Sequence, residues 1–138
     1  MAGITLGASC LGIGCSSTTP ATPATGLIAA GNVKTVAVGS LAFVPNQPLI
    51  LGRDDKGLYA MTAICTHQQC SMVENGSVSA TEVKCTCHGS KFSRNGDVTA
   101  GPATAPLEHY KVDVAADGAI SINASSKVGK DDRAAVPA

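Results

Sequence analysis

The sequence is poor in aromatic residues: its 138 residues include no Trp, two Tyr and two Phe. It also lacks any excess of charge, because ten Lys and Arg balance ten Asp and Glu. Nucleic-acid binding proteins need basic patches and stacking rings, so this composition argues against that class. A core with so few rings must be built from Val, Ile, Leu and Ala. The six Cys therefore indicate additional staples, either disulfides or a metal centre.

Residues 1–33, about the first quarter of the chain, carry no charged side chain, and Lys34 is the first charged residue. Residues 1–15 are small and apolar, but too short and too rich in Gly to span a membrane as a helix. We interpret residues 1–32 as the remnant of an export signal followed by a flexible Ser/Thr/Pro/Ala linker. The sequence before Cys15 resembles a bacterial lipoprotein cleavage box, which implies a lipid anchor at that Cys. The alternative is a disordered tail with two incidental cysteines, Cys10 and Cys15.

From Gly31 onward the chain alternates short apolar runs with turn residues, a pattern that predicts an all-β sandwich or barrel. We expect a strand over residues 33–38, hairpins that pair 49–51 with 58–64 and 110–114 with 119–122, and an Asn95-Gly96 turn. The predicted domain covers residues 33–123. The polar residues 124–138 are predicted to be a frayed C-terminal tail.

Four Cys and two His are concentrated between Cys65 and His88, in the boxes Cys-Thr-His-Gln-Gln-Cys (65–70) and Cys-Thr-Cys-His-Gly-Ser (85–90). Thiolates and imidazoles on two loops indicate a metal site. Structural zinc would use two Cys and two His but leaves two Cys unexplained. Disulfides alone leave both His without a role. A [2Fe–2S] cluster with two Cys and two His ligands is the third alternative. The remaining histidine, His109, stands apart and is interpreted as a structural residue.

The two boxes, with seventeen residues between His67 and Cys85, resemble those of the Rieske family. The similarity covers roughly residues 33–123 and extends through the segments 91–93, 95–96, 101–103 and 106–107. It implies a Rieske-type antiparallel β sandwich or barrel. It also implies a small cluster-binding subdomain of two loops, at about residues 63–106.

The resemblance implies a role for each residue of the boxes. Cys65 and Cys85 would hold one iron of a [2Fe–2S] cluster, and His67 and His88 would hold the other. The remaining pair, Cys70 and Cys87, matches family members in which a disulfide joins the two loops, the respiratory, higher-potential type. Four further residues would lie beside the cluster: Gly89, Ser90, Phe92 and Pro102. The resemblance also implies that the Ser90 hydroxyl donates to a bridging sulfide.

The sequence departs from the family pattern at several positions. Gln69 stands where Gly is usual, which predicts a changed local backbone. Gln68 is polar where many quinol-oxidising members are apolar, and Thr86 replaces a usual Pro. Phe92 replaces a Tyr that hydrogen-bonds a ligand Cys in many high-potential members. Losing that donor lowers the reduction potential, so we expect an intermediate value within about −150 to +300 mV, which Phe92→Tyr would raise.

The expected function is one-electron transfer between redox proteins, as a periplasmic carrier that is soluble or lipid-anchored. An oxidising compartment is favoured by the expected disulfide, which makes the cytoplasm the less favoured location. The alternative is a Rieske subunit of a larger oxidoreductase, either a cytochrome bc-type quinol oxidase or an arsenite oxidase-like enzyme. An oxygenase ferredoxin is disfavoured by the same disulfide. The sequence shows no separate catalytic acid, base or nucleophile, so it leaves open whether the chain belongs to an enzyme.

Overall fold

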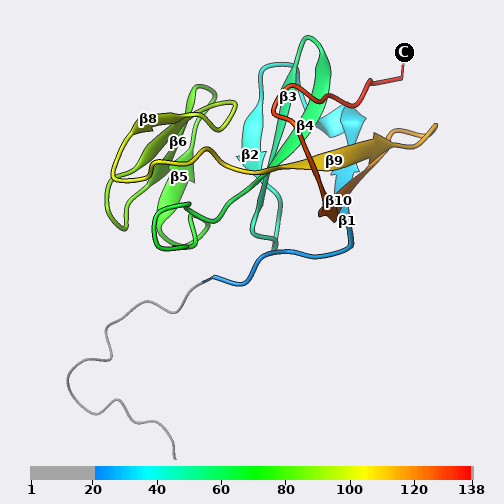
Figure 1. Cartoon of the computed structure of the whole chain (residues 1–138). Coiled ribbons are helices and arrows are strands. Elements are labelled where there is room, and N and C mark those ends of the chain that lie inside the picture. Colours follow the sequence, from blue (N-terminus) through cyan, green and yellow to red (C-terminus); the bar gives the residue numbers. More distant parts are fainter. Residues whose placement is uncertain (1–20, 138) are drawn as a thin grey trace, which may run out of the picture.

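The computed structural model describes residues 21–137 and consists of two antiparallel sheets, which lie side by side (Figure 1). We call them the base sheet and the small sheet. The base sheet has the order β1-β10-β9-β4-β3-β2. Its strands are β1 (Leu27–Asn32), β2 (Leu41–Phe43), β3 (Leu49–Asp54), β4 (Gly57–Thr62), β9 (His109–Val114) and β10 (Ala119–Val128). The small sheet contains β5 (Gly76–Val78), β6 (Glu82–Cys85), β7 (Lys91–Ser93) and β8 (Val98–Ala100) in sequence order. The predicted all-β class is confirmed.

Strand β4 is buried along its whole length because apolar side chains cover both of its faces. Leu58 and Ala60 belong to an aliphatic core that lies against β9 and β10. Tyr59 and Met61 alternate with them and point to a second core, which includes Val83 and Phe92 of the small sheet. Successive strand residues face opposite sides of a sheet, so this single strand joins the two cores.

Both expected hairpins are present: β3 pairs with β4, and β9 pairs with β10. The expected strand over residues 33–38 is wrong, because Val33–Thr35 forms a 3-10 turn. The Asn32 side chain accepts a hydrogen bond from the Lys34 amide (3.0 Å), and the Arg53 guanidinium donates to the carbonyls of Val33 and Val36. These side-chain contacts satisfy backbone groups locally and so compete with strand pairing.

Both ends of the chain contribute more structure than the sequence pattern indicated. Strand β1 falls within the stretch interpreted as a linker, and it pairs with β10. Strand β10 continues to Val128, and Ala134 forms two backbone hydrogen bonds with Leu58 (2.9 and 2.8 Å). The C-terminal residues expected to fray are therefore attached to the base sheet. The predicted export segment, with Cys10 and Cys15, lies outside the described residues.

The Arg94 side chain holds the two sheets together. Its guanidinium donates to the carbonyls of Gly39 (3.2 Å) and Arg53 (3.2 Å) near the base sheet and to that of Ala80 (2.8 Å) between β5 and β6. The Tyr59 hydroxyl donates to the Arg94 carbonyl (2.9 Å). A guanidinium has five donors in a fixed plane, which suits it to collecting carbonyls from several segments. The small sheet is therefore fastened to the base sheet by polar as well as apolar contacts.

Candidate metal centre

The two Cys/His boxes lie on neighbouring loops that a disulfide joins. The first box follows β4, and the second begins at the end of β6 and precedes β7. Cys70 and Cys87 form the disulfide, with Cα atoms 6.6 Å apart. The expected pairing is thus confirmed. Backbone hydrogen bonds close each loop on itself, from the Cys65 amide to the Cys70 carbonyl and from the Cys85 amide to the Ser90 carbonyl, both at 2.8 Å.

Among the described residues, Cys65 and Cys85 are the free cysteines, and both are buried with 1% exposure. Burial raises the pKa of the Cys65 thiol above its ordinary value, and the neighbouring Cys85 thiol raises it further. The two thiols are within hydrogen-bonding reach of each other. Two adjacent buried thiols of this kind become a strong donor pair when a metal displaces their protons.

The two predicted histidine ligands face each other across the loops. The ring centroids of His67 and His88 are 4.8 Å apart, and their planes stand at 82°. His67 is partly buried, and its Nδ1 atom is buried without a hydrogen-bond partner among the described residues. A buried polar atom without a partner is costly, and a metal ion would satisfy this one. Two thiols and two imidazoles converge here, so the residues fit a [2Fe–2S] cluster.

The Cys70–Cys87 disulfide lies close to the free thiol of Cys85. The sulfur atoms of Cys70, Cys85 and Cys87 all lie within 4.8 Å of one another. Two of these sulfurs are bonded to each other and carry no thiolate charge, so the three do not form a metal site of their own. Their proximity means that the disulfide packs directly against Cys85.

The residues expected beside the cluster occupy distinct positions around the second loop. Gly89 has a φ of +87°, a left-handed conformation that favours Gly, and it lets the chain turn between His88 and β7. The buried Ser90 hydroxyl accepts from the Ala103 amide (3.0 Å) and lies within hydrogen-bonding reach of Cys65. Pro102 is exposed next to Ala103. Phe92 is fully buried in the core beneath the loops.

Two contacts of the first loop were not predicted from the sequence. The Thr66 hydroxyl donates to the Ala105 carbonyl (2.7 Å) and so attaches this loop to residues 101–107. The Ala21 amide donates to the Gln69 carbonyl (3.0 Å), which fixes the N-terminal segment on the same loop. Gln68 and Gln69 have φ values of +62° and +54°. Gln69, which stands where Gly is usual in the family, thus adopts a left-handed conformation that favours Gly. The Thr66–Ala105 and Ala21–Gln69 contacts join residues far apart in sequence, so no local sequence pattern predicts them.

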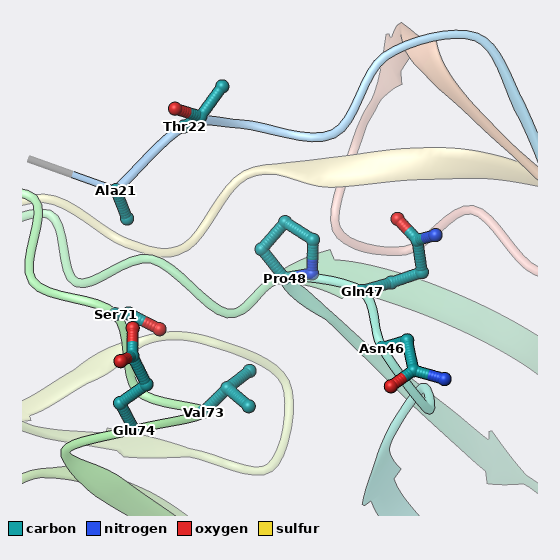
Figure 2. A pocket seen from close by; sticks show the side chains of 8 residues that line it. All are labelled: Ala21, Thr22, Asn46, Gln47, Pro48, Ser71, Val73 and Glu74. Atoms are coloured by element: carbon teal, nitrogen blue, oxygen red, sulfur yellow. The ribbon is translucent and has the colours of Figure 1, made fainter.

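The pocket in Figure 2, about 270 Å³ in volume, is not lined by any of the paired thiols and imidazoles. Its lining comes from the N-terminal segment, the β2–β3 turn and the residues after Cys70. The lining includes one ionisable side chain, Glu74, and none of the predicted ligands. The pocket therefore does not indicate a separate chemistry.

Known proteins provide an independent comparison. The family model of the Rieske [2Fe-2S] domain matches residues 26–111. This chain belongs to the Rieske [2Fe-2S] domain family. The resemblance expected from the two boxes is thereby confirmed, and so are the [2Fe–2S] cluster as cofactor and electron transfer as function.

Two relatives of this Rieske domain carry the name cytochrome b6-f complex iron-sulfur subunit. That of Chlorobaculum tepidum is 35% identical over 101 residues, which cover 66% of this chain and 54% of the relative. That of Synechococcus sp. (strain CC9605) is 37% identical over 73 residues, which cover 53% of this chain and 40% of the relative. This chain therefore matches only about half the length of these curated relatives.

Solved structures show the same fold at lower sequence identity. The cyanobacterial plasma membrane Rieske protein PetC3 from Synechocystis PCC 6803 is 23% identical, with a TM-score of 0.51 over 70% of this chain and 99% of that one. A chain in the complex of oxygenase and ferredoxin of carbazole 1,9a-dioxygenase is 24% identical, with a TM-score of 0.53 over 74% of this chain and 95% of that one. Within residues 21–137, no helix is both long and apolar enough to cross a membrane.

Proposed function

We propose that Cys65 and Cys85 hold one iron of the cluster and that His67 and His88 hold the other. The observation that carries the assignment is the convergence of two buried free thiols with two facing imidazoles, on loops joined by the Cys70–Cys87 disulfide. We also propose that the cluster-binding subdomain comprises about residues 63–106. Both boxes and the whole small sheet fall within that range.

When bound, the cluster accepts and releases one electron at a time. The protein supplies its surroundings. Cys65 and Cys85 lie buried, so the thiolate side of the site is shielded from water. His88 is exposed and His67 is partly exposed, so a partner approaches the site from the imidazole side. No substrate bond is made or broken by these residues, and the electron moves between proteins through the exposed ring edges.

The ligand assignment predicts how the reduction potential responds to pH. An imidazole bound to a ferric iron would be more acidic than one bound to a ferrous iron, so the oxidised form would lose protons more readily at alkaline pH. Protein-film voltammetry should therefore show a potential that falls as pH rises through these ionisations. A potential that stays constant into strongly alkaline solution would contradict coordination by two histidines.

The chain's surface suggests how a partner docks. The loops around the proposed site, residues 63–73, 85–90 and 98–107, contain no Asp, Glu, Lys or Arg. Gln68, Gln69, His88 and Gly89 are exposed there. We propose that redox partners dock through neutral polar contacts at this surface. The rate of electron transfer to a cytochrome c, measured by stopped flow, should then change little with ionic strength, whereas a steep decrease would reveal charge steering.

We propose that the chain acts in the periplasm or at the outer face of a bacterial membrane, as a carrier between redox proteins. The disulfide supports this location, because disulfides persist in oxidising compartments. The second candidate is a subunit of a quinol-oxidising cytochrome complex, which the names of the two relatives support. Native electrophoresis of gently solubilised membranes distinguishes them. Migration alone supports the carrier, and co-migration with a b-type cytochrome supports the subunit.

A further inference from the structure

The C-terminal residues 130–134 contact both sheets at once. Arg133 Nε lies 2.9 Å from Asp54 Oδ2 at the end of β3, and Arg133 Nη2 donates to Asn95 Oδ1 (2.9 Å) in the β7–β8 turn. Lys130 Nζ lies 3.1 Å from Asp97 Oδ1 in the same turn. These residues therefore connect the base sheet to the small sheet, beyond the range 26–111 that the family model matches.

The Arg133 side chain is held on several sides. It is only 12% exposed, and its guanidinium carbon lies 4.1 Å from the centre of the Tyr59 ring. Its Nη1 atom donates to the carbonyls of Lys130 (2.8 Å) and Asp132 (2.9 Å), which fixes the segment's own backbone. A planar guanidinium that is paired with a carboxylate and stacked on a ring has a defined position that a Lys ammonium does not reproduce.

The segment also approaches the base sheet very closely. Beside the two backbone hydrogen bonds between Leu58 and Ala134, Gly57 has a φ of +136°. A Cβ atom at Gly57 would clash with the Ala134 carbonyl oxygen. The hairpin thus has a Gly at a position where a side chain would push the segment away.

The turn that Arg133 contacts is connected to the loops of the metal centre. The Gly96 carbonyl accepts from the Leu107 amide (2.9 Å), at the end of the loop whose Ala105 carbonyl accepts from Thr66. The Asn95 carbonyl is bonded to His109 Nε2 (2.8 Å). In the other direction, β7 runs from this turn back toward Ser90. A displacement of the turn would therefore reach both sides of the metal centre.

We propose that residues 130–134 form a clamp that fixes the Asn95–Gly96 turn, and through it the cluster loops, against the base sheet. Arg133 is the positioning residue of the clamp. It contacts no proposed ligand and acts through Asn95. The clamp makes the cluster-binding subdomain and the base sheet one unit, so the exposed His88 keeps a constant orientation. Only this last consequence rests on the proposed function, in which redox partners approach the cluster from the side of His67 and His88.

Amide hydrogen exchange of the cluster-loaded protein tests the clamp without any redox partner. In Arg133→Ala, the Leu107 amide should exchange about tenfold faster or more, because a charge-assisted hydrogen bond that holds the turn is gone. Exchange at Val112 in the middle of β9 should change much less. Lys111→Ala removes an exposed ion pair with Asp113 on the same sheet and serves as the matched control, with no effect at Leu107 expected.

Two further variants separate positioning from general stability. Arg133→Lys keeps a cation near Asp54 but loses the planar fork, so it should still accelerate exchange at Leu107. Asn95→Ala should accelerate it too, and adding Arg133→Ala to that variant should have little additional effect. Unchanged exchange at Leu107 in Arg133→Ala would overturn the proposal. Equal acceleration at Leu107 and Val112, or fully additive effects in the double variant, would also overturn it. These results would leave the ligand assignment untouched.

Discussion

The two cores of this protein are stabilised in different ways. The core that lies against β9 and β10 is aliphatic apart from Tyr110, and includes Leu49, Leu58 and Ile122. The core under the small sheet contains Cys65, Cys70 and Cys85 among its buried members. The first core is filled mainly by branched aliphatic side chains, whereas the second combines the buried rings of Tyr59 and Phe92 with these cysteines. Packing therefore secures the base sheet, whereas the cluster loops depend on a disulfide, a cofactor and specific hydrogen bonds.

The largest effect is expected from a cavity in the aliphatic core. Leu58 is fully buried, so Leu58→Ala should lower the free energy of unfolding by about 2–5 kcal/mol. Urea unfolding followed by circular dichroism measures this loss. The visible spectrum of the cluster in the absence of urea should stay unchanged, because Leu58 lies outside the second core. Leu27→Ala, at a side chain with 73% exposure, is the control and should have little effect.

Removal of the disulfide should lower the stability of the cluster loops more than that of the base sheet. The pair Cys70→Ala and Cys87→Ala opens a link across 17 residues, which the chain-entropy estimate values at about 3 kcal/mol. The cluster absorbance should be lost at lower urea concentration than the strand signal of the base sheet. Thr86→Ala, at an exposed residue in the same loop, should keep the cluster absorbance. Simultaneous loss of both signals at an unchanged midpoint would contradict the contrast between the regions.

His109 lies where the two regions meet, and its ionisation should weaken the junction in acid. Burial lowers the pKa of His109, and the nearby Arg133 lowers it further, although the bond to the Asn95 carbonyl opposes this. The unfolded chain then binds a proton at a higher pH than the folded chain does. Stability should therefore be fully present above the ordinary histidine pKa of about 6.5 and should decrease as pH falls below it.

The variant His109→Gln isolates this contribution, because the other histidines remain. The difference in unfolding free energy between wild type and variant should vary with pH below about 6.5 and level off above it. A difference that does not change with pH would contradict the assignment of a buried neutral imidazole at this position.

A smaller effect, a gain in stability, is expected from removing the backbone strain at Gln69 in the first loop. Gln69 has a φ of +54°, and a left-handed conformation costs a non-Gly residue about 1–2 kcal/mol. Gln69→Gly should thus stabilise the loop by about 1 kcal/mol, after allowing for the greater freedom of Gly in the unfolded chain. The urea midpoint of the cluster absorbance measures this change. Gln47→Gly, at a position without a positive φ, should be destabilising instead.

The sequence allowed the family, the cofactor and the disulfide to be predicted, because the two boxes place Cys65, His67, Cys85 and His88 at fixed spacing. The β3–β4 and β9–β10 hairpins were predictable from alternating apolar residues around short turns. These features are local, so a single stretch of sequence carries the whole signal.

The ends of the chain could not be predicted in this way. Strand β1 has few large apolar residues, and it is a strand because β10 supplies its hydrogen-bond partners. The C-terminal segment is polar, and its order depends on Arg133 reaching Asp54 and Asn95, which are 79 and 38 positions away in sequence. The Thr66–Ala105 and Ala21–Gln69 contacts are likewise long-range. Tertiary partners decide such structure, and composition does not reveal them.

The most direct test of the central claim is pulsed electron paramagnetic resonance of the dithionite-reduced protein. Two imidazoles on one iron should produce hyperfine couplings from two histidine nitrogens. His88→Cys should remove one of these couplings, whereas His109→Gln should leave both unchanged. The wild type should give a paramagnetic [2Fe–2S] signal with both nitrogen couplings. A signal without nitrogen couplings, or a colourless protein that contains zinc and gives no signal, would contradict it.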